Sequence, residues 1–263
     1  MLPRAKKSYG QNWLVDETVI AKIIAAAEIV PGEAVLEIGP GTGVLTQALV
    51  DAGARVTAVE ADRDLVGALK MRFGDKIELI QGNVLEIRVG YMDEYKVVAN
   101  IPYNITSDVL KKFLTVEPRP SRMVLMLQRE VTDRIVAVPP QMSLLSVVCQ
   151  IYAHCRKVAN VPAGAFRPIP KVDSAIVRLD IRHEREQWLP PMNATPESII
   201  ALAKAGFSSP RKQLHHNLSA HLHLPAEQVK EALQSLGLDP KIRAEALTPE
   251  QWIQLTHLWN TNA

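Results

Sequence analysis

The segment that most constrains the fold is a short apolar run that leads through a glycine-rich turn into a helical pattern. Ala34–Ile38 is typical of a buried strand, Gly39–Gly43 has glycine at every second position, and Val44–Ala52 has the apolar spacing of a helix. Glycines let the backbone turn tightly and approach a ligand closely. A strand, a tight turn and a helix in this order open a βαβ unit, which predicts a parallel sheet covered by helices.

The same alternation of strand and helix patterns continues along the chain. Further strands are expected at Arg55–Glu60, Ile77–Gln81, Lys96–Ala99 and Met123–Leu127, and helices at Thr18–Ile29, Asp64–Phe73, Ser107–Leu114, Glu130–Val138 and Met142–Tyr152. The last two strand patterns, Arg156–Val161 and Ser174–Ile181, are joined by a Pro-rich loop, so we expect an antiparallel pair at the sheet edge. Together these patterns predict an α/β fold with a mostly parallel seven-stranded sheet.

The composition changes at the polar segment Glu184–Asn193, which we interpret as a linker. Beyond it only helical patterns occur, with a helix start at Thr195-Pro196-Glu197 and a capping box at Thr248–Gln251. We therefore expect a first domain over residues 1–185, with a basic N-terminal arm over residues 1–15. A small all-helical domain is expected over residues 186–263.

Composition excludes several classes of protein. No stretch approaches the ~20 apolar residues that span a bilayer, and no signal peptide is recognisable. Two cysteines, Cys149 and Cys155, are too few for a disulfide framework, so we expect reduced thiols and a cytoplasmic location. The net charge is +2, with an acidic excess in residues 1–100 and a basic excess afterwards, so the second half is the candidate for a polyanionic partner.

The glycine turn is typical of a site whose ligand contains a nucleoside but no pyrophosphate. Gly39, Gly41 and Gly43 form a G-x-G-x-G pattern, which differs from the G-x-G-x-x-G of dinucleotide binders. Glu60 ends the next strand, where an acid can accept hydrogen bonds from both ribose hydroxyls, and Asn83 follows the strand after that. The alternative is a plain tight turn with a surface acid.

The segment Asn100–Tyr103 follows the fourth strand and should lie over the same crevice. Adenine N6 is a poor nucleophile because its lone pair is delocalised into the ring. A side-chain oxygen of Asn100 and a main-chain carbonyl near Ile101-Pro102 could accept both N6 hydrogens and favour the pyramidal amine. Tyr103 offers a flat face on which an extruded base can stack. The pattern predicts adenine-N6 methylation, with a strand-ending turn as the alternative.

These motifs resemble those of the KsgA family, which dimethylates N6 of two adjacent adenosines near the 3′ end of small-subunit (16S) rRNA. The matching segments are Lys6–Leu14, Glu37–Gly43, Asn100–Tyr103, Gln128–Val131, Phe166–Ser174 and Phe207–Leu214. The resemblance implies a Rossmann-like class I methyltransferase fold that uses S-adenosyl-L-methionine and releases S-adenosyl-L-homocysteine. It also implies a role in ribosome biogenesis, with rRNA in a small-subunit precursor particle as the partner of a monomeric protein that needs no metal.

The resemblance also assigns roles to individual residues. Cofactor contacts are implied for Asn12, Leu14, Gly39, Gly41, Gly43, Glu60, Asn83 and Asn100. Catalysis is implied for Asn100, Ile101, Pro102 and Tyr103, with Phe166 stacking on the target base opposite Tyr103. RNA contacts are expected from Arg4, Lys6, Lys7, Lys171, Arg211 and Lys212.

Two positions depart from the family pattern. Asn83 stands where the family usually has Asp, so a charge beside the cofactor is lost. The segment Val138–Leu145 replaces a stretch that often contains Gly and Arg, and an RNA contact is lost with it. The histidines His215, His216, His221 and His223 have no accompanying carboxylate, so we expect surface or RNA-facing residues rather than a metal site.

Three other functions compete with this interpretation. An Erm-type enzyme would methylate an adenosine of large-subunit (23S) rRNA, but the arm and Arg211–Leu214 favour the small subunit. A noncatalytic assembly factor on the same fold would be expected to lack the catalytic Asn or the glycines, and both are present. A DNA adenine methyltransferase would usually carry a target-recognition insertion, which is not apparent.

Overall fold

A computed structural model describes residues 5–6, 9–88, 94–182 and 194–260. The chain forms two compact units. One consists of Met1–Asp133 and Ala153–Arg182, and the other of Arg134–Tyr152 and His183–Ala263. Within the described residues, no helix is long and apolar enough to cross a membrane.

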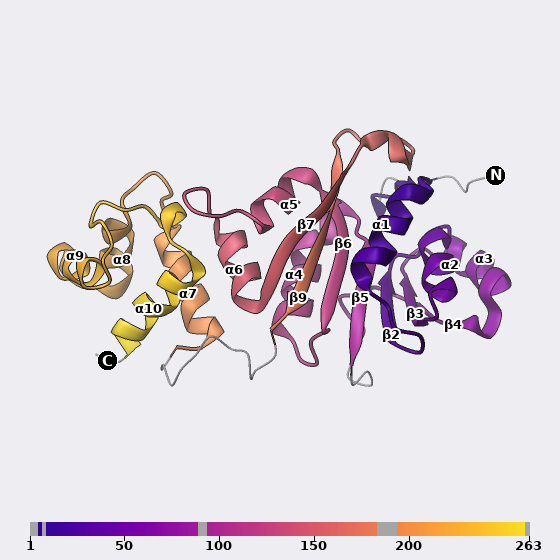
Figure 1. The fold of residues 1–263 in the computed structure, drawn as a ribbon, viewed down its shortest axis with the longest axis horizontal. Helices are drawn as coiled ribbons and strands as arrows, with labels where there is room; N and C mark the ends of the chain where they lie inside the picture. Colours follow the sequence, from indigo (N-terminus) through magenta and orange to yellow (C-terminus); the bar gives the residue numbers. More distant parts are fainter. Residues whose placement is uncertain (1–4, 7–8, 89–93, 183–193, 261–263) are drawn as a thin grey trace. The chain divides into compact units, whose positions relative to one another are not determined.

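The first unit is built on a seven-stranded sheet of order β4-β3-β2-β5-β6-β9-β7 (Figure 1). Its strands are β2 (Ala34–Ile38), β3 (Arg55–Glu60), β4 (Ile77–Gln81), β5 (Tyr95–Asn100), β6 (Arg122–Gln128), β7 (Ala153–Val161) and β9 (Ser174–Ile181). Strands β2 to β6 pair in parallel, whereas β9 is antiparallel to both β6 and β7. The predicted parallel sheet and its antiparallel edge pair are therefore confirmed.

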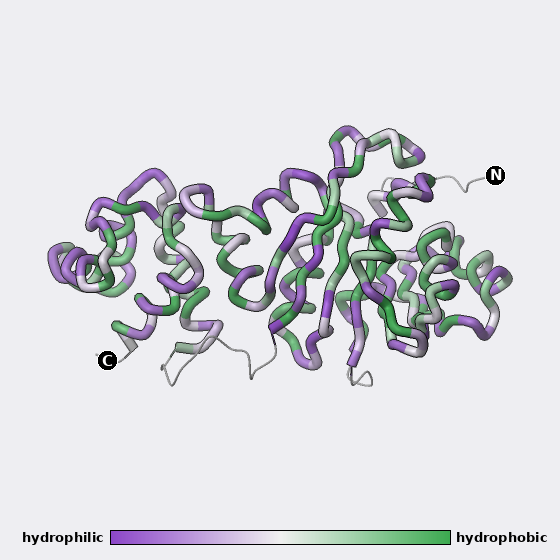
Figure 2. Tube along the Cα trace, in the orientation of Figure 1, coloured by the Kyte–Doolittle hydropathy of each residue, from purple (hydrophilic) through white to green (hydrophobic). Residues whose placement is uncertain are grey.

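Helices alternate with these strands as predicted. They are α1 (Glu17–Ala27), α2 (Val44–Asp51), α3 (Arg63–Phe73), α4 (Thr106–Thr115) and α5 (Arg129–Ile135). The α5 pattern was expected to continue to Val138, but the helix ends at Ile135, shortly before Pro139-Pro140. Strands β2, β5 and β6 are buried along nearly their whole length, and hydrophobic segments run through the sheet (Figure 2). Burial on both faces of a strand is what a parallel sheet between helices requires.

A second, two-stranded sheet was not expected from the sequence. Strand β1 (Trp13–Leu14) pairs antiparallel with β8 (Phe166–Arg167), with Leu14 opposite Phe166. Two-residue strands carry no detectable periodicity, so only the tertiary structure shows this pairing. It joins the N-terminal arm to the loop that carries Phe166.

The second unit is helical, with α6 (Leu144–Tyr152), α7 (Pro196–Gly206), α8 (Leu214–Leu222), α9 (Ala226–Ser235) and α10 (Pro249–Asn260). Both predicted helix starts are confirmed, because Thr195 with Ser198 and Thr248 with Gln251 form reciprocal capping bonds.

The core contains Trp252, and His215 is only 3% exposed, with its Nδ1 3.0 Å from the Pro240 carbonyl. The expectation of a surface histidine is therefore wrong for His215.

The predicted division at residues 185 and 186, and the predicted linker, lie outside the described residues. The structure also places Arg134–Tyr152 in the helical unit, whereas the sequence assigned it to the first domain. The reason is packing, since Met142, Val147 and Ile151 share a core with the C-terminal helices. An apolar helix face does not reveal from sequence which core it will join.

Candidate active site

A cavity of about 580 Å³ lies beyond the carboxyl ends of β2 to β5, where open α/β sheets usually bind ligands. Its lining brings together nearly all of the predicted cofactor and catalytic residues from six separate parts of the chain. They are Asn12, Leu14, Gly39, Gly41, Glu60, Asn83, Asn100, Ile101, Pro102, Tyr103 and Phe166. Parallel strands end at the same sheet edge, which brings together the turn, Glu60, Asn83 and Asn100–Tyr103. The arm and Phe166 are paired with each other through β1 and β8.

The three glycines of the turn have left-handed backbone conformations but different surroundings. Gly39 and Gly41 have φ +66° and +58° and line the cavity. A Cβ on Gly41 would lie 2.8 Å from the Trp13 ring, so this glycine allows the arm to pack on the turn. Gly43 is absent from the cavity lining, and its Cβ would lie 2.6 Å from the Phe73 ring. Gly43 therefore serves the packing of α3 in this structure, which differs from its expected cofactor contact.

Glu60 is held in one orientation by the backbone around it. Its carboxylate accepts hydrogen bonds from Gly41 N at 3.1 Å and Asp62 N at 2.8 Å, and the residue is 5% exposed. Burial raises the pKa of Glu60, and the two backbone hydrogen bonds oppose that shift. The free lone pairs of this fixed carboxylate are suited to ribose hydroxyls.

Both polar atoms of the Asn83 side-chain amide form hydrogen bonds within the protein. Its Nδ2 donates to Glu86 Oε1 at 3.0 Å, and its Oδ1 accepts from Leu85 N at 3.1 Å. A carbonyl oxygen has two lone pairs, so Oδ1 can accept a second bond from an amine in the cavity. The expected contact remains possible with Asn in place of Asp.

Asn100 is oriented by the N-terminal arm. Its Nδ2 donates to the Asn12 carbonyl at 3.3 Å, which leaves Oδ1 as an acceptor in the cavity that Asn100 lines. Tyr103, three residues later, is held by a 2.8 Å hydrogen bond between its hydroxyl and Ser174 Oγ. Ser174 is fully buried and begins β9, so the hydroxyl anchor is rigid.

For the RNA methylation that the motifs predict, we expect Ser174→Ala to lower kcat/KM about fivefold, because a partly buried hydrogen bond that orients the Tyr103 ring is lost. Tyr103→Phe removes the same bond from the other side and should cost a similar factor. The double variant should then lose little more than either single variant. Additive losses in steady-state methylation assays would contradict the coupling, and variants as active as the wild type would show that the bond has no role in orientation.

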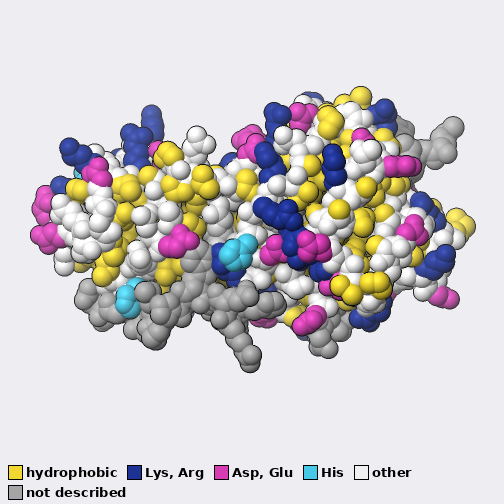
Figure 3. Space-filling view, viewed as in Figure 1, with side chains coloured by type: hydrophobic (Ala, Val, Ile, Leu, Met, Phe, Trp, Pro, Cys, Tyr) yellow, Lys and Arg dark blue, Asp and Glu magenta, His cyan; other side chains and the backbone are white. Residues whose placement is uncertain are grey.

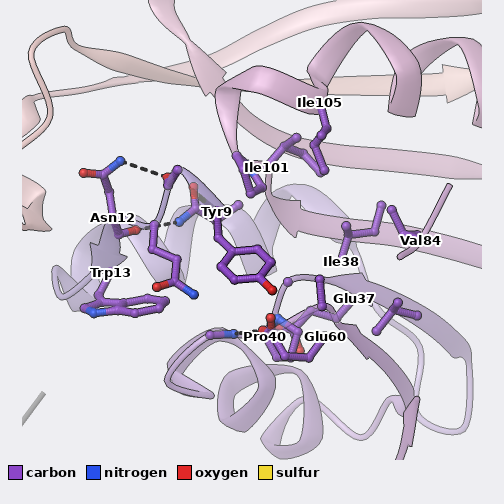
Figure 4. A pocket seen from close by; sticks show the side chains of 18 of the residues that line it. Tyr9, Asn12, Trp13, Glu37, Ile38, Pro40, Glu60, Val84, Ile101 and Ile105 are labelled. Carbon is purple, nitrogen blue, oxygen red and sulfur yellow. Dashed lines mark hydrogen bonds between the residues drawn. The ribbon is translucent and has the colours of Figure 1, made fainter. Parts of the chain in front are cut away.

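Several other side chains of the cavity have no role assigned from the sequence. Tyr9, Gln11, Trp13 and Glu37 all line it, and the Tyr9 ring points across the cavity towards Glu37 and Glu60 (Figure 4). Three lie inside the arm motif Lys6–Leu14, and Glu37 is the first residue of the motif Glu37–Gly43. Glu37 Oε2 is buried with no hydrogen-bond partner among the described residues. Burial, opposed by the Thr46 hydroxyl and reinforced by nearby Glu60, raises the pKa of Glu37 to about 8.

This raised pKa predicts a pH dependence of stability. An unfolded carboxyl group titrates near pH 4.5, so folded Glu37 retains its proton between pH 4.5 and about 8, and its stabilising contribution is lost as pH rises through that window. Between pH 6 and pH 8 the free protein should lose about 2 kcal/mol more unfolding free energy than Glu37→Gln, which stays neutral. Urea unfolding at both pH values measures the difference. Parallel losses in the two proteins would mean that Glu37 does not titrate in this range.

The predicted RNA-binding residues lie in different environments. Lys171, Arg211 and Lys212 are exposed, whereas Lys6 is engaged in ion pairs with Asp62 and Asp64. Arg4 and Lys7 lie outside the described residues. On the face shown in Figure 3, Lys and Arg are interspersed with Asp and Glu. In the described part of the chain, no group of three His, Cys, Asp or Glu side chains converges as metal ligands would.

Comparison with known proteins decides the family. The model of the ribosomal RNA adenine dimethylase family matches residues 3–261. The chain belongs to this family. Curated dimethylase relatives named ribosomal RNA small subunit methyltransferase A include one from Thermosynechococcus vestitus, 44% identical over 97% of both chains. Another, from Dehalococcoides mccartyi, is 38% identical over 98% of this chain and 90% of its own.

Solved structures share the dimethylase fold along most of the chain. A dimethyladenosine transferase from Plasmodium falciparum has a TM-score of 0.81 and 27% identity, covering 94% of this chain and 97% of its own. The 23S rRNA methyltransferase ErmE has a TM-score of 0.78 and 30% identity, covering 93% of this chain and 98% of its own. The fold is thus that of a Rossmann-like methyltransferase with a helical C-terminal region.

Proposed function

We propose that this protein dimethylates N6 of two adjacent adenosines near the 3′ end of small-subunit rRNA, with S-adenosyl-L-methionine as methyl donor. The observation that carries the proposal is the single cavity in which Glu60 and the glycine turn meet Asn100, Tyr103 and Phe166. Curated relatives at 38–44% identity named for the small subunit favour it over the large-subunit activity named for ErmE.

The cavity residues fit this cofactor. Gly39 has no atom within 4 Å of the position of a Cβ, so its backbone leaves room for the methionine part. Glu37 Oε2, buried and unpartnered among the described residues, can accept from the amino group of the same part. Glu60 would hold the ribose and Asn83 the adenine amine, while Asn12 and Leu14 close the cavity from the arm. The bound cofactor would supply a methyl group on a sulfonium, which is an excellent leaving group.

The protein's own contribution is to position the target adenine and polarise its amine. Asn100 Oδ1 would accept one N6 hydrogen and the backbone carbonyl near Ile101-Pro102 the other, so that the nitrogen lone pair faces the methyl group. Tyr103 and Phe166 would stack on the two faces of the extruded base. Phe166 is 1% exposed and its segment pairs with the arm through β1 and β8, so a face of its ring would have to be uncovered when the base enters. No metal or covalent intermediate is needed.

The proposal extends to the partner and the place of action. Lys171, Arg211 and Lys212, all exposed, would contact phosphates of rRNA in a small-subunit precursor particle, with RNA shape selecting the site. Such a substrate places the enzyme in ribosome biogenesis in the cytoplasm, where we expect it to act as a monomer.

The test is to incubate the purified protein and radiolabelled S-adenosylmethionine with unmethylated small and large ribosomal particles, and to identify the modified nucleoside. N6,N6-dimethyladenosine in the small subunit is the expected product. Label in the large subunit would transfer the assignment to the Erm-type activity. No label in either particle, with intact cofactor binding, would favour a noncatalytic assembly factor.

A further inference from the structure

Lys6 belongs to the basic arm, where a cation is expected to contact RNA, but its ammonium group faces the protein. Its Nζ lies 2.6 Å from Asp62 Oδ1 and 2.6 Å from Asp64 Oδ2. It also lies 5.8 Å from the centre of the Tyr9 ring. The Asp62 side chain is only 2% exposed, so this carboxylate has little access to any other cation. An ammonium group between two carboxylates is poorly placed to bind a phosphate.

The contacts of Lys6 form a closed network with Gln11. The Lys6 backbone N donates to Gln11 Oε1 at 2.7 Å, and Gln11 Nε2 donates to Asp62 Oδ2 at 2.9 Å. Asp62 is therefore bound by two side chains of the arm. Burial acts to raise the pKa of Asp62, but the hydrogen bonds from Lys6 and Gln11 outweigh it and lower the pKa. The carboxylate is thus charged, as the network requires.

Asp62 links this network directly to the cofactor cavity. Its backbone N donates to Glu60 Oε1 at 2.8 Å, and Glu60 in turn accepts from Gly41 N. On the arm side, residues 9–14 line the cavity, and Trp13 packs on Gly41. Among the described residues of the arm, Lys6 makes the ion pair that joins the arm to Asp62, two residues after the Glu60 that ends β3.

We propose that Lys6 is a positioning residue of the cofactor site, whose ammonium group fastens the N-terminal arm to Asp62 and holds residues 9–14 over the cavity. The inference rests on the proposed function, because it assumes that the cavity binds the adenosyl cofactor. It replaces the expectation that Lys6 contacts RNA. Asn12, which orients Asn100, and Leu14, which pairs with Phe166, lie on the wall that Lys6 fastens.

The test compares Lys6→Met, which keeps the apolar stem, with Lys6→Arg, which keeps the charge, and with Lys22→Met on α1 as a matched exposed control. Calorimetry without RNA measures S-adenosylhomocysteine affinity, and hydrogen exchange of the free protein measures protection of the Trp13 and Leu14 amides. Lys6→Met should weaken binding by about threefold to tenfold and speed exchange. Lys6→Arg should restore both, and Lys22→Met should change neither.

RNA binding tests the alternative role of Lys6, that of a phosphate ligand. If Lys6 does not contact phosphate, Lys6→Met should leave the slope of log K for rRNA against log salt unchanged. A slope reduced by about one would overturn the inference, because Lys6 would then be a phosphate ligand. Unchanged cofactor affinity in Lys6→Met would also overturn it. Failure of the wild-type protein to methylate ribosomal particles while it binds S-adenosylhomocysteine would instead count against the proposed function and leave the role of Lys6 standing.

Discussion

Asn100→Ala should reduce kcat about a thousandfold and leave S-adenosylhomocysteine affinity within a few fold of the wild type. Asn100 Nδ2 is bound to the Asn12 carbonyl, so Oδ1 is the atom that faces the cavity as an acceptor. Without it, no side-chain oxygen at this position accepts an N6 hydrogen, and the amine remains planar and unreactive. Single-turnover methylation of small-subunit particles measures the loss at the chemical step.

The matched control is Asn160→Ala, an exposed asparagine of β7 that does not line the cavity. This variant should keep full activity. An Asn100→Ala enzyme with near wild-type kcat would refute the proposed mechanism. Loss of cofactor affinity equal to the loss of kcat would instead show that Asn100 acts by supporting the arm through Asn12.

Gly39→Ala should mainly lower cofactor affinity and Gly43→Ala should mainly lower stability, although both glycines belong to one motif. At Gly39 a Cβ would enter the open space of the cavity, where the methionine part of the cofactor is proposed to lie. The Cβ should overpack the bound cofactor at a cost of about 1–3 kcal/mol, which weakens S-adenosylhomocysteine binding about fivefold to 150-fold. The left-handed backbone adds a stability cost of only about 1 kcal/mol.

At Gly43 a Cβ would lie 2.6 Å from the Phe73 ring, in the packed contact between the turn and α3. Ring overlap and the left-handed backbone together should lower the unfolding free energy by about 3 kcal/mol. Denaturant unfolding and calorimetric binding of both variants separate the two effects. Equal affinity losses at equal stability would contradict the separate roles.

The sequence by itself determined most of the fold and the composition of the site. Strand and helix periods follow directly from the residues, so β2, β3, β4 and β9 begin and end where the patterns predict. The glycine turn follows β2, while Glu60 ends β3 and Asn100 ends β5, and the end of a parallel strand is a fixed place in an α/β sheet. Local pattern and general topology were therefore enough to predict one shared cavity.

Only the tertiary structure decided the partners of residues whose roles depend on distant segments. The pairing of Lys6 with Asp62 spans 56 residues, and β1 and β8 are too short to have a period of their own. The burial of Glu37 and of His215, and the membership of α6 in the helical unit, depend likewise on what packs around them. Charge and hydropathy set which contacts are favourable, but the folded chain decides which of them form, since each contact needs its two partners within a few ångströms.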